Sequence, residues 1–255
     1  MLSWIEVEHN LDFWGALFKL WGYDADHNPI YWTFNIGGYE AVFWPRVMIM
    51  TWLVMIIVLA LAVAATRNMD LRHPKGLQNV FEFAYLGIQG LVHQAMDTEK
   101  GKAVTQFAFA LILFIATCNL IGLVPTMAAP TADLNTTAGL ALISFVLTWY
   151  YGIRYKGIGY FKHWFKPVVF FLPLNLLEEF VKPVTLAARL FGNIYAKEIL
   201  ICTWLGMFMG TWQFGVGIIA SVAWLAFSVF ISLIQAFVFC VLTINYIGMA
   251  TADDH

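Results

Sequence analysis

Long apolar runs limit how this chain can fold more than any other feature of its sequence. Residues 45–66, 104–124, 136–151 and 213–250 are almost free of charged side chains. About 20 helical residues are enough to cross the hydrocarbon core of a bilayer. Over the whole chain 61% of the residues are apolar and only 12% are charged, a composition typical of proteins embedded in lipid. The sequence therefore predicts an all-α polytopic membrane protein.

We expect about five membrane-embedded helices and one interfacial helix. The first three spans are predicted at 45–66, 104–124 and 136–151. Segment 76–98 mixes apolar with polar residues and is predicted to be the interfacial helix. Two long, tilted helices are expected to form the C-terminal half. As one helix the run 213–250 would be about 57 Å long, against a hydrocarbon core of about 30 Å, so it is tilted, lies partly flat or consists of two helices.

Basic residues cluster on one side of this arrangement. They follow the first span, close the interfacial segment and follow the third span: Arg67, Arg72, His73, Lys75, Lys100, Lys102, Arg154, Lys156, Lys162 and Lys166. The positive-inside rule assigns that side to the cytoplasm, which puts the N-terminus outside. We expect the C-terminus in the cytoplasm. Residues 1–43 are predicted to be an extracytoplasmic or interfacial segment of a single membrane domain, which continues through the spans of 44–166 and the more polar region 168–250.

Arg189 is a fixed positive charge in the middle of an apolar stretch. Guanidinium does not titrate near neutral pH, and holding it at membrane depth costs between about 2.5 and 17 kcal/mol. The side chain must therefore face a carboxylate, a water-filled cavity or both. Snorkelling to the membrane surface is the alternative, but Arg189 lies too far inside its segment for that explanation to be favoured.

Helical geometry places two further polar residues relative to Arg189. At about 100° per residue, Asn193 projects within about 40° of Arg189, whereas Glu198 projects near 180°, on the opposite face. A helix with a permanent cation on one face and a titratable acid on the other could serve two separate aqueous compartments. Structural alternatives remain: Glu198 could be neutralised by the adjacent Lys197 or could end the span at an interface, and Lys197 is itself expected to snorkel to the interface.

The last apolar run carries a narrow polar seam. Gln235, Ser228 and Ser221 repeat at heptad spacing and fall within about 40° of one face. The seam fits an ion path, and it equally fits interhelical hydrogen bonds that serve packing. Asn193 has the same two interpretations.

An acidic pair, Glu178 and Glu179, precedes Pro183. These acids could reach the region of Arg189 if the chain forms a hairpin there, although a proline inside a helix makes any angular extrapolation unsafe.

Four segments agree in order and spacing with one known family. Residues 182–198 read KPVTLAARLFGNIYAKE, and they are accompanied by NLIGLVP at 119–125, PTADLNTT at 130–137 and QAFVFCVLTINYIGMA at 235–250. Together they closely resemble the signature of subunit a of F-type ATP synthases, the channel subunit of the stator. The resemblance spans residues 76–250 and leaves the first 40 or so residues unmatched.

The resemblance implies roles for individual residues. Arg189 would be the essential stator arginine that faces the ring of c subunits. Polar positions of the ion path are matched by Glu198, Gln235, Asn193, Asn119 and Asp133, and acidic positions before Lys-Pro are matched by Glu178 and Glu179. Ser228 stands where some members have a histidine, and Lys197 stands where a small or acidic residue is common. Asp133 also has a simpler interpretation as a turn former.

The resemblance also implies a function and partners. The chain would provide two offset half-channels that carry H⁺ or Na⁺ to and from the c-ring, in a bacterial plasma membrane, together with peripheral-stalk b subunits and the remaining subunits. We expect no cofactor and no nucleic-acid partner. We also expect the chain to catalyse no reaction itself, because no phosphate-binding loop is present. Cys118, Cys202 and Cys240 lack metal or disulfide spacing and are predicted to act as small hydrophobes.

Two other classes of protein compete with this interpretation. A secondary transporter could use an intramembrane arginine to bind an anionic substrate, but no internal repeat is visible in the sequence. A membrane scaffold would tolerate loss of Arg189. A transporter would be active alone, whereas a stator subunit requires its ring.

Overall fold

The computed structural model describes residues 32–36, 39–67, 76–124, 127, 129–157, 159–162, 170, 172–208 and 214–252. The chain divides into two compact units, Met1–Leu53 and Val54–His255. The boundary falls inside helix α2 (Pro45–Thr66), whose bounds are those predicted for the first span.

A β-hairpin precedes α2. Strands β1 (Trp32–Ile36) and β2 (Tyr39–Phe43) pair antiparallel, with Trp32 opposite Phe43 and Ile36 opposite Tyr39. The sequence analysis predicted no strands in this segment. Both strands are rich in aromatic and β-branched residues, which favour extended backbone.

Helices make up nearly all of the described part of the second unit. After α2 they are α3 (Leu77–Ala95), α4 (Thr98–Ile121), α5 (Leu134–Lys156), α6 (Gly159–Lys162), α7 (Leu172–Phe208) and α8 (Phe214–Thr251), with a short 3-10 helix η2 (Pro130–Ala132) before α5. The predicted all-α polytopic class is confirmed for the membrane region. α3 matches the predicted interfacial segment closely.

Four described helices are long and apolar enough to cross a membrane. They are α2, α4 from Gly101, α5, and α8 from Ser221. α7 is long enough but is not among the four. This agrees with the sequence analysis, in which charged residues interrupt the apolar stretches between 169 and 212.

The two C-terminal helices are continuous, which removes two uncertainties of the sequence analysis. α8 is one helix of 38 residues and not two shorter ones. α7 has 37 residues and runs through Pro183 without ending there. Each is therefore about 56 Å long, well beyond the thickness of a hydrocarbon core. In a membrane both helices must be tilted or must project beyond the core.

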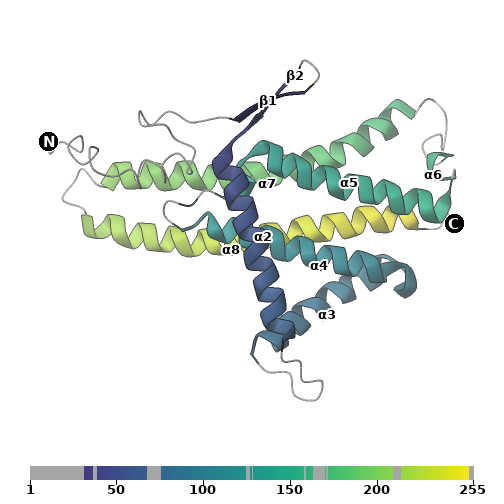
Figure 1. Cartoon of the computed structure of the whole chain (residues 1–255), viewed down its shortest axis with the longest axis horizontal. Helices are drawn as coiled ribbons and strands as arrows, with labels where there is room; N and C mark the ends of the chain where they lie inside the picture. Colours follow the sequence, from purple (N-terminus) through teal and green to yellow (C-terminus); the bar gives the residue numbers. More distant parts are fainter. Residues whose placement is uncertain are drawn as a thin grey trace. The chain divides into compact units, whose positions relative to one another are not determined.

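α7 and α8 are antiparallel neighbours, and Figure 1 shows them side by side. Residues that come later in α7 contact residues that come earlier in α8. Lys182 lies over the ring of Tyr246, Asn193 bonds to Gln235, and Lys197 bonds to Ser232. α5 packs against both helices and α4 packs against α8.

Two apolar clusters hold these helices together. The first joins α4, α5, α7, α8 and the residue before η2 through Leu111, Ile115, Ala129, Ala141, Leu186, Ala187, Leu190, Ile194, Ala236 and Phe239. The second joins α3, α4, α5 and α8 through Ile88, Val92, Val104, Ala108, Tyr151, Cys240, Ile244 and Ile247. Cys118 and Cys240 are buried free thiols, as predicted, and the side chain of Cys202 lies outside the described residues.

Candidate functional site

Arg189 lies near the middle of α7 and points away from the helix bundle. Its neighbours Leu186 and Leu190 are buried in the first apolar cluster, whereas Arg189 itself is exposed. Within the part of the chain that the structure describes, Arg189 forms neither a hydrogen bond nor an ion pair. A cation this deep in an apolar helix requires an acceptor, and the described part of the chain offers none.

The predicted polar seam lies between α7 and α8. The amide of Asn193 donates to Oε1 of Gln235 over 2.6 Å, and Lys197 Nζ donates to Oγ of Ser232 over 2.7 Å. Ser232 Oγ donates in turn to the backbone carbonyl of Ser228. Polar contacts thus follow the helix pair over almost two turns of α8.

Two atoms of this seam are buried without a partner among the described residues. They are Oγ of Ser228, a residue with no exposed surface, and Nε2 of Gln235, a residue only 4% exposed. Buried polar groups are nearly always hydrogen-bonded, so a partner such as a water molecule is expected at each atom. Trp224 Nε1, one turn before Ser228, is buried and unpartnered in the same way.

Lys197 does not snorkel, so that expectation was wrong. The residue is 7% exposed, and its ammonium bonds to Ser232 inside the helix pair. On α7 it lies about 80° from Arg189, on the side that packs against α8, so its side chain extends into the seam. Ser232 was missed by the sequence analysis, although it lies one helical turn from both Ser228 and Gln235 and the same periodicity could have found it.

Asn119 adjoins the seam and links it to neighbouring elements. It is 1% exposed, donates to the backbone carbonyl of Ser232 over 3.2 Å and accepts from Thr131 Oγ1 over 2.8 Å. It therefore ties α4, η2 and α8 together.

Asp133 caps α5, in agreement with the simpler interpretation. Its Oδ2 accepts from the backbone N–H of Thr136 over 3.1 Å, and the structure gives it no contact with the seam. Glu198 belongs to α7, nine residues after Arg189, and its side chain lies outside the described residues.

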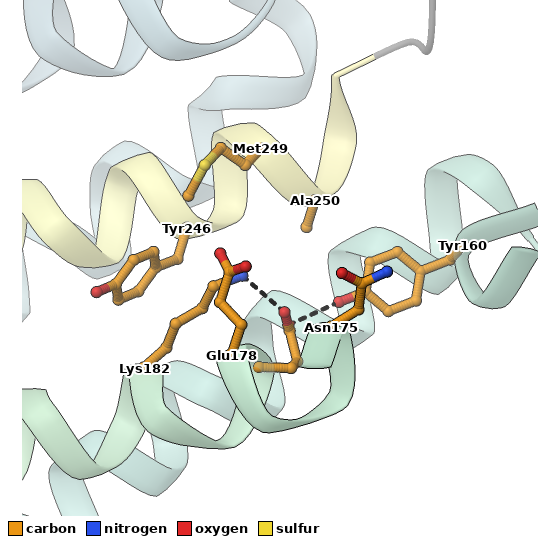
Figure 2. Close-up of a pocket in the computed structure, with 8 residues that line it drawn as sticks. Tyr160, Asn175, Glu178, Lys182, Tyr246, Met249 and Ala250 are labelled. Carbon is orange, nitrogen blue, oxygen red and sulfur yellow. Dashed lines mark hydrogen bonds and ion pairs between the residues drawn. The ribbon is translucent and has the colours of Figure 1, made fainter. Parts of the chain in front are cut away.

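The acidic pair divides between two faces of α7. Glu179 is 7% exposed: Oε1 accepts from the hydroxyl of Tyr160 over 3.0 Å, and Oε2 accepts from Lys182 Nζ over 2.6 Å. Figure 2 shows Lys182 on α7 and Tyr160 on α6, with the dashed lines of these two contacts. Glu178 is exposed and has no such partner in the described ranges.

Both acids line a cavity of about 150 Å³ at one end of the α7–α8 pair. The remaining wall is made by Tyr160, Asn175, Lys182, Tyr246, Met249 and Ala250 (Figure 2). Helix α7 therefore has two polar regions, the cavity near its start and the seam farther along, with Arg189 between them. No group of three His, Cys, Asp or Glu side chains in the described ranges could hold a metal ion.

Comparison with known proteins now decides the family. The model of the family described as ATP synthase A chain matches residues 48–248. The chain belongs to the ATP synthase subunit a family. It is similar to ATP synthase subunit a of Desulforamulus reducens, with 42% identity over 97% of this chain and 91% of the relative. It is 36% identical to subunit a of Staphylococcus carnosus over 88% of this chain and 97% of the relative.

Membership of the subunit a family confirms the function class predicted from the sequence. The chain is a membrane protein and a non-catalytic, ion-translocating stator subunit of an ATP synthase. These matches give no support to the alternative of a secondary transporter.

Proposed function

We propose that Arg189 separates two half-channels that open to opposite sides of the membrane. The observation that carries this proposal is an exposed guanidinium, without a partner among the described residues, between two polar regions of one continuous helix. Along α7, Glu178 lies about 16 Å before Arg189 and Glu198 about 14 Å after it. A fixed charge between them raises the barrier to direct passage of a cation, because bringing like charges together is unfavourable in a medium of low dielectric constant.

We assign the seam to the access half-channel and the cavity to the exit half-channel. Ions would enter from outside past Glu198, Gln235, Asn193 and Ser228, and leave through the cavity beside Glu178. The unpartnered atoms of Ser228 and Gln235 support a water-filled access route.

The orientation follows from the basic residues. Tyr160, a few residues beyond the basic end of α5, lines the same cavity as Ala250 near the C-terminus. If the basic side is cytoplasmic, the C-terminus is cytoplasmic too and the N-terminus lies outside. We assign the chain to a bacterial plasma membrane. The chain then works as one membrane domain.

The partner at Arg189 would be the ring of c subunits. The exposed residues of α7 near the arginine include a polar or small set beside large apolar ones such as Val184 and Tyr195. The polar or small set is Glu178, Thr185, Ala188, Gly192, Asn193 and Ala196. A returning ionised carboxylate on the ring would pair with Arg189, and this pairing favours release of its ion toward the exit. Peripheral-stalk b subunits would hold the chain still against the torque.

The test replaces Arg189 by Ala and by Lys in the reconstituted complex. Both variants should assemble and lose ATP-driven ion pumping at least tenfold, because an ammonium is more strongly hydrated and lacks the planar, delocalised charge of guanidinium. Arg154→Ala, at the basic end of α5, is the matched control and should pump normally. Normal pumping by Arg189→Ala would exclude the proposal, and ion flux through the isolated chain would favour a transporter.

A further inference from the structure

Lys182 creates a difficulty for any mechanism in which Arg189 receives the ring carboxylate. It lies seven residues before Arg189, which is about 10 Å along the helix and within about 20° of the same face. A second free cation there would compete for the same carboxylate and would repel the ion that leaves through the cavity.

The structure shows where the ammonium of Lys182 is held instead. It bonds to Glu179 Oε2 over 2.6 Å and lies 5.8 Å from the ring centre of Tyr246 on α8. Only 22% of the side chain is exposed. An ammonium paired with a buried carboxylate and an aromatic face has little tendency to move toward another anion.

Glu179 is fixed from a different element. The hydroxyl of Tyr160 on α6 donates to Oε1, so that both carboxylate oxygens have a donor, and only 9% of the Glu179 side chain is exposed. The ring of Tyr160 packs directly against Gly152 of α5, where a Cβ atom would come within 2.7 Å of the ring. Glycine at 152 therefore permits α6 to approach and bring the hydroxyl to Glu179.

Tyr160 stays a hydrogen-bond donor at neutral pH. Burial, together with the negative charge of Glu179, raises the pKa of Tyr160 well above its usual range. Other described polar groups that line the same pockets as Glu179 are Ser144 and Thr148 on α5, Tyr246 on α8, and Asn175 and Glu178 on α7.

We propose that Glu179, anchored by Tyr160, is a positioning residue that neutralises Lys182 and leaves Arg189 as the cation available to the ring. This inference rests on the proposed function of Arg189. It separates the two adjacent acids: Glu178, exposed at the cavity, exchanges ions, whereas Glu179 stays bound to Lys182 and Tyr160. Tyr160 and Lys182 thereby gain roles in coupling without touching the translocated ion.

The decisive experiment is a charge rescue in the reconstituted complex. Glu179→Gln should lower ATP-driven pumping at least fivefold, because it releases Lys182. Adding Lys182→Gln should restore at least half of the unmodified rate, because the competing cation is gone. Glu178→Gln is the matched control: it should also slow pumping, and Lys182→Gln should not rescue it.

Each result decides between interpretations. If the Glu179→Gln, Lys182→Gln double variant pumps as poorly as Glu179→Gln alone, Glu179 acts on the ion itself and the inference is wrong. If Glu179→Gln does not assemble, Tyr160→Phe provides the test, since it keeps both charges and removes only the anchor. That variant should pump about twofold more slowly, and an unchanged rate would overturn the inference. Normal pumping by Arg189→Ala would instead overturn the proposed function.

Discussion

Single residues of α7 differ in role because a helix turns about 100° at each step. Glu178 and Glu179 are adjacent in sequence, yet one is exposed at the cavity and the other is buried between Tyr160 and Lys182. Arg189 and Lys197 also lie on different faces: the arginine is exposed on the surface of the helix bundle, and the lysine is buried in the seam. The functional value of a charge in this chain depends on the face that it occupies.

Glu198 provides the prediction at this scale. Glu198→Gln keeps the shape and the hydrogen-bonding capacity of the side chain but cannot exchange a proton, so ATP-driven pumping should fall about tenfold while assembly stays intact. The measurement is the pumping rate of the reconstituted complex over a range of pH. Glu82→Gln, on the exposed side of α3, is the control and should pump normally. If Glu198→Gln reproduces the unmodified rate and pH profile, Glu198 has a structural role only.

Whole elements meet through a few buried polar contacts among many apolar ones. In α8, Ser228, Ser232 and Gln235 are buried polar residues within a largely apolar helix. Asn119 reaches this seam from α4 and also binds Thr131 of η2, so three elements are held by one amide. Losing such a contact is costly wherever it leaves a buried donor or acceptor unsatisfied.

Asn119 should therefore matter more for stability than for pumping. Asn119→Leu has a similar volume but leaves the Thr131 hydroxyl without its acceptor, which should lower the stability of the folded chain by about 1–3 kcal/mol. The change is measured by heating the purified complex and recording the temperature at which this subunit is released. Asn79→Leu on the exposed side of α3 should have little effect. Unchanged stability with slow pumping would instead place Asn119 in the ion path.

The second unit as a whole has two ends of different character. One end contains the cavity, the basic end of α5 and the end of α8, and the other contains the capped start of α5. The antiparallel pairing of α7 and α8 fixes this division, because it brings the start of one helix beside the end of the other.

Labelling of single cysteines checks the orientation. In a variant without the native cysteines, Ala252→Cys should react with a membrane-impermeant maleimide only from the cytoplasmic side. Asn135→Cys, exposed at the start of α5, should react only from outside. Both positions reacting from one side would contradict the assigned topology.

The sequence by itself determined that the chain is embedded in lipid, which fold class and family it belongs to, and that Arg189 is important. Apolar runs of sufficient length require membrane helices, and a permanent charge at membrane depth requires a partner whatever the packing. These conclusions need only local composition and helical periodicity, which is why the bounds of α2 and the approximate bounds of α3, α4 and α5 could be predicted.

Only the tertiary structure decided which polar residues share a site. The sequence could not show that Lys197 turns into the seam, that Asn119 and Asp133 stabilise turns and contacts, or that Tyr160 binds Glu179 from 19 residues away. Each of these depends on contacts between elements, and helical periodicity within one element carries no information about its neighbour. The β-hairpin before α2 and the continuity of α7 through Pro183 also had to be observed in three dimensions, because the cost of one missing hydrogen bond can be offset by packing along the rest of a long helix.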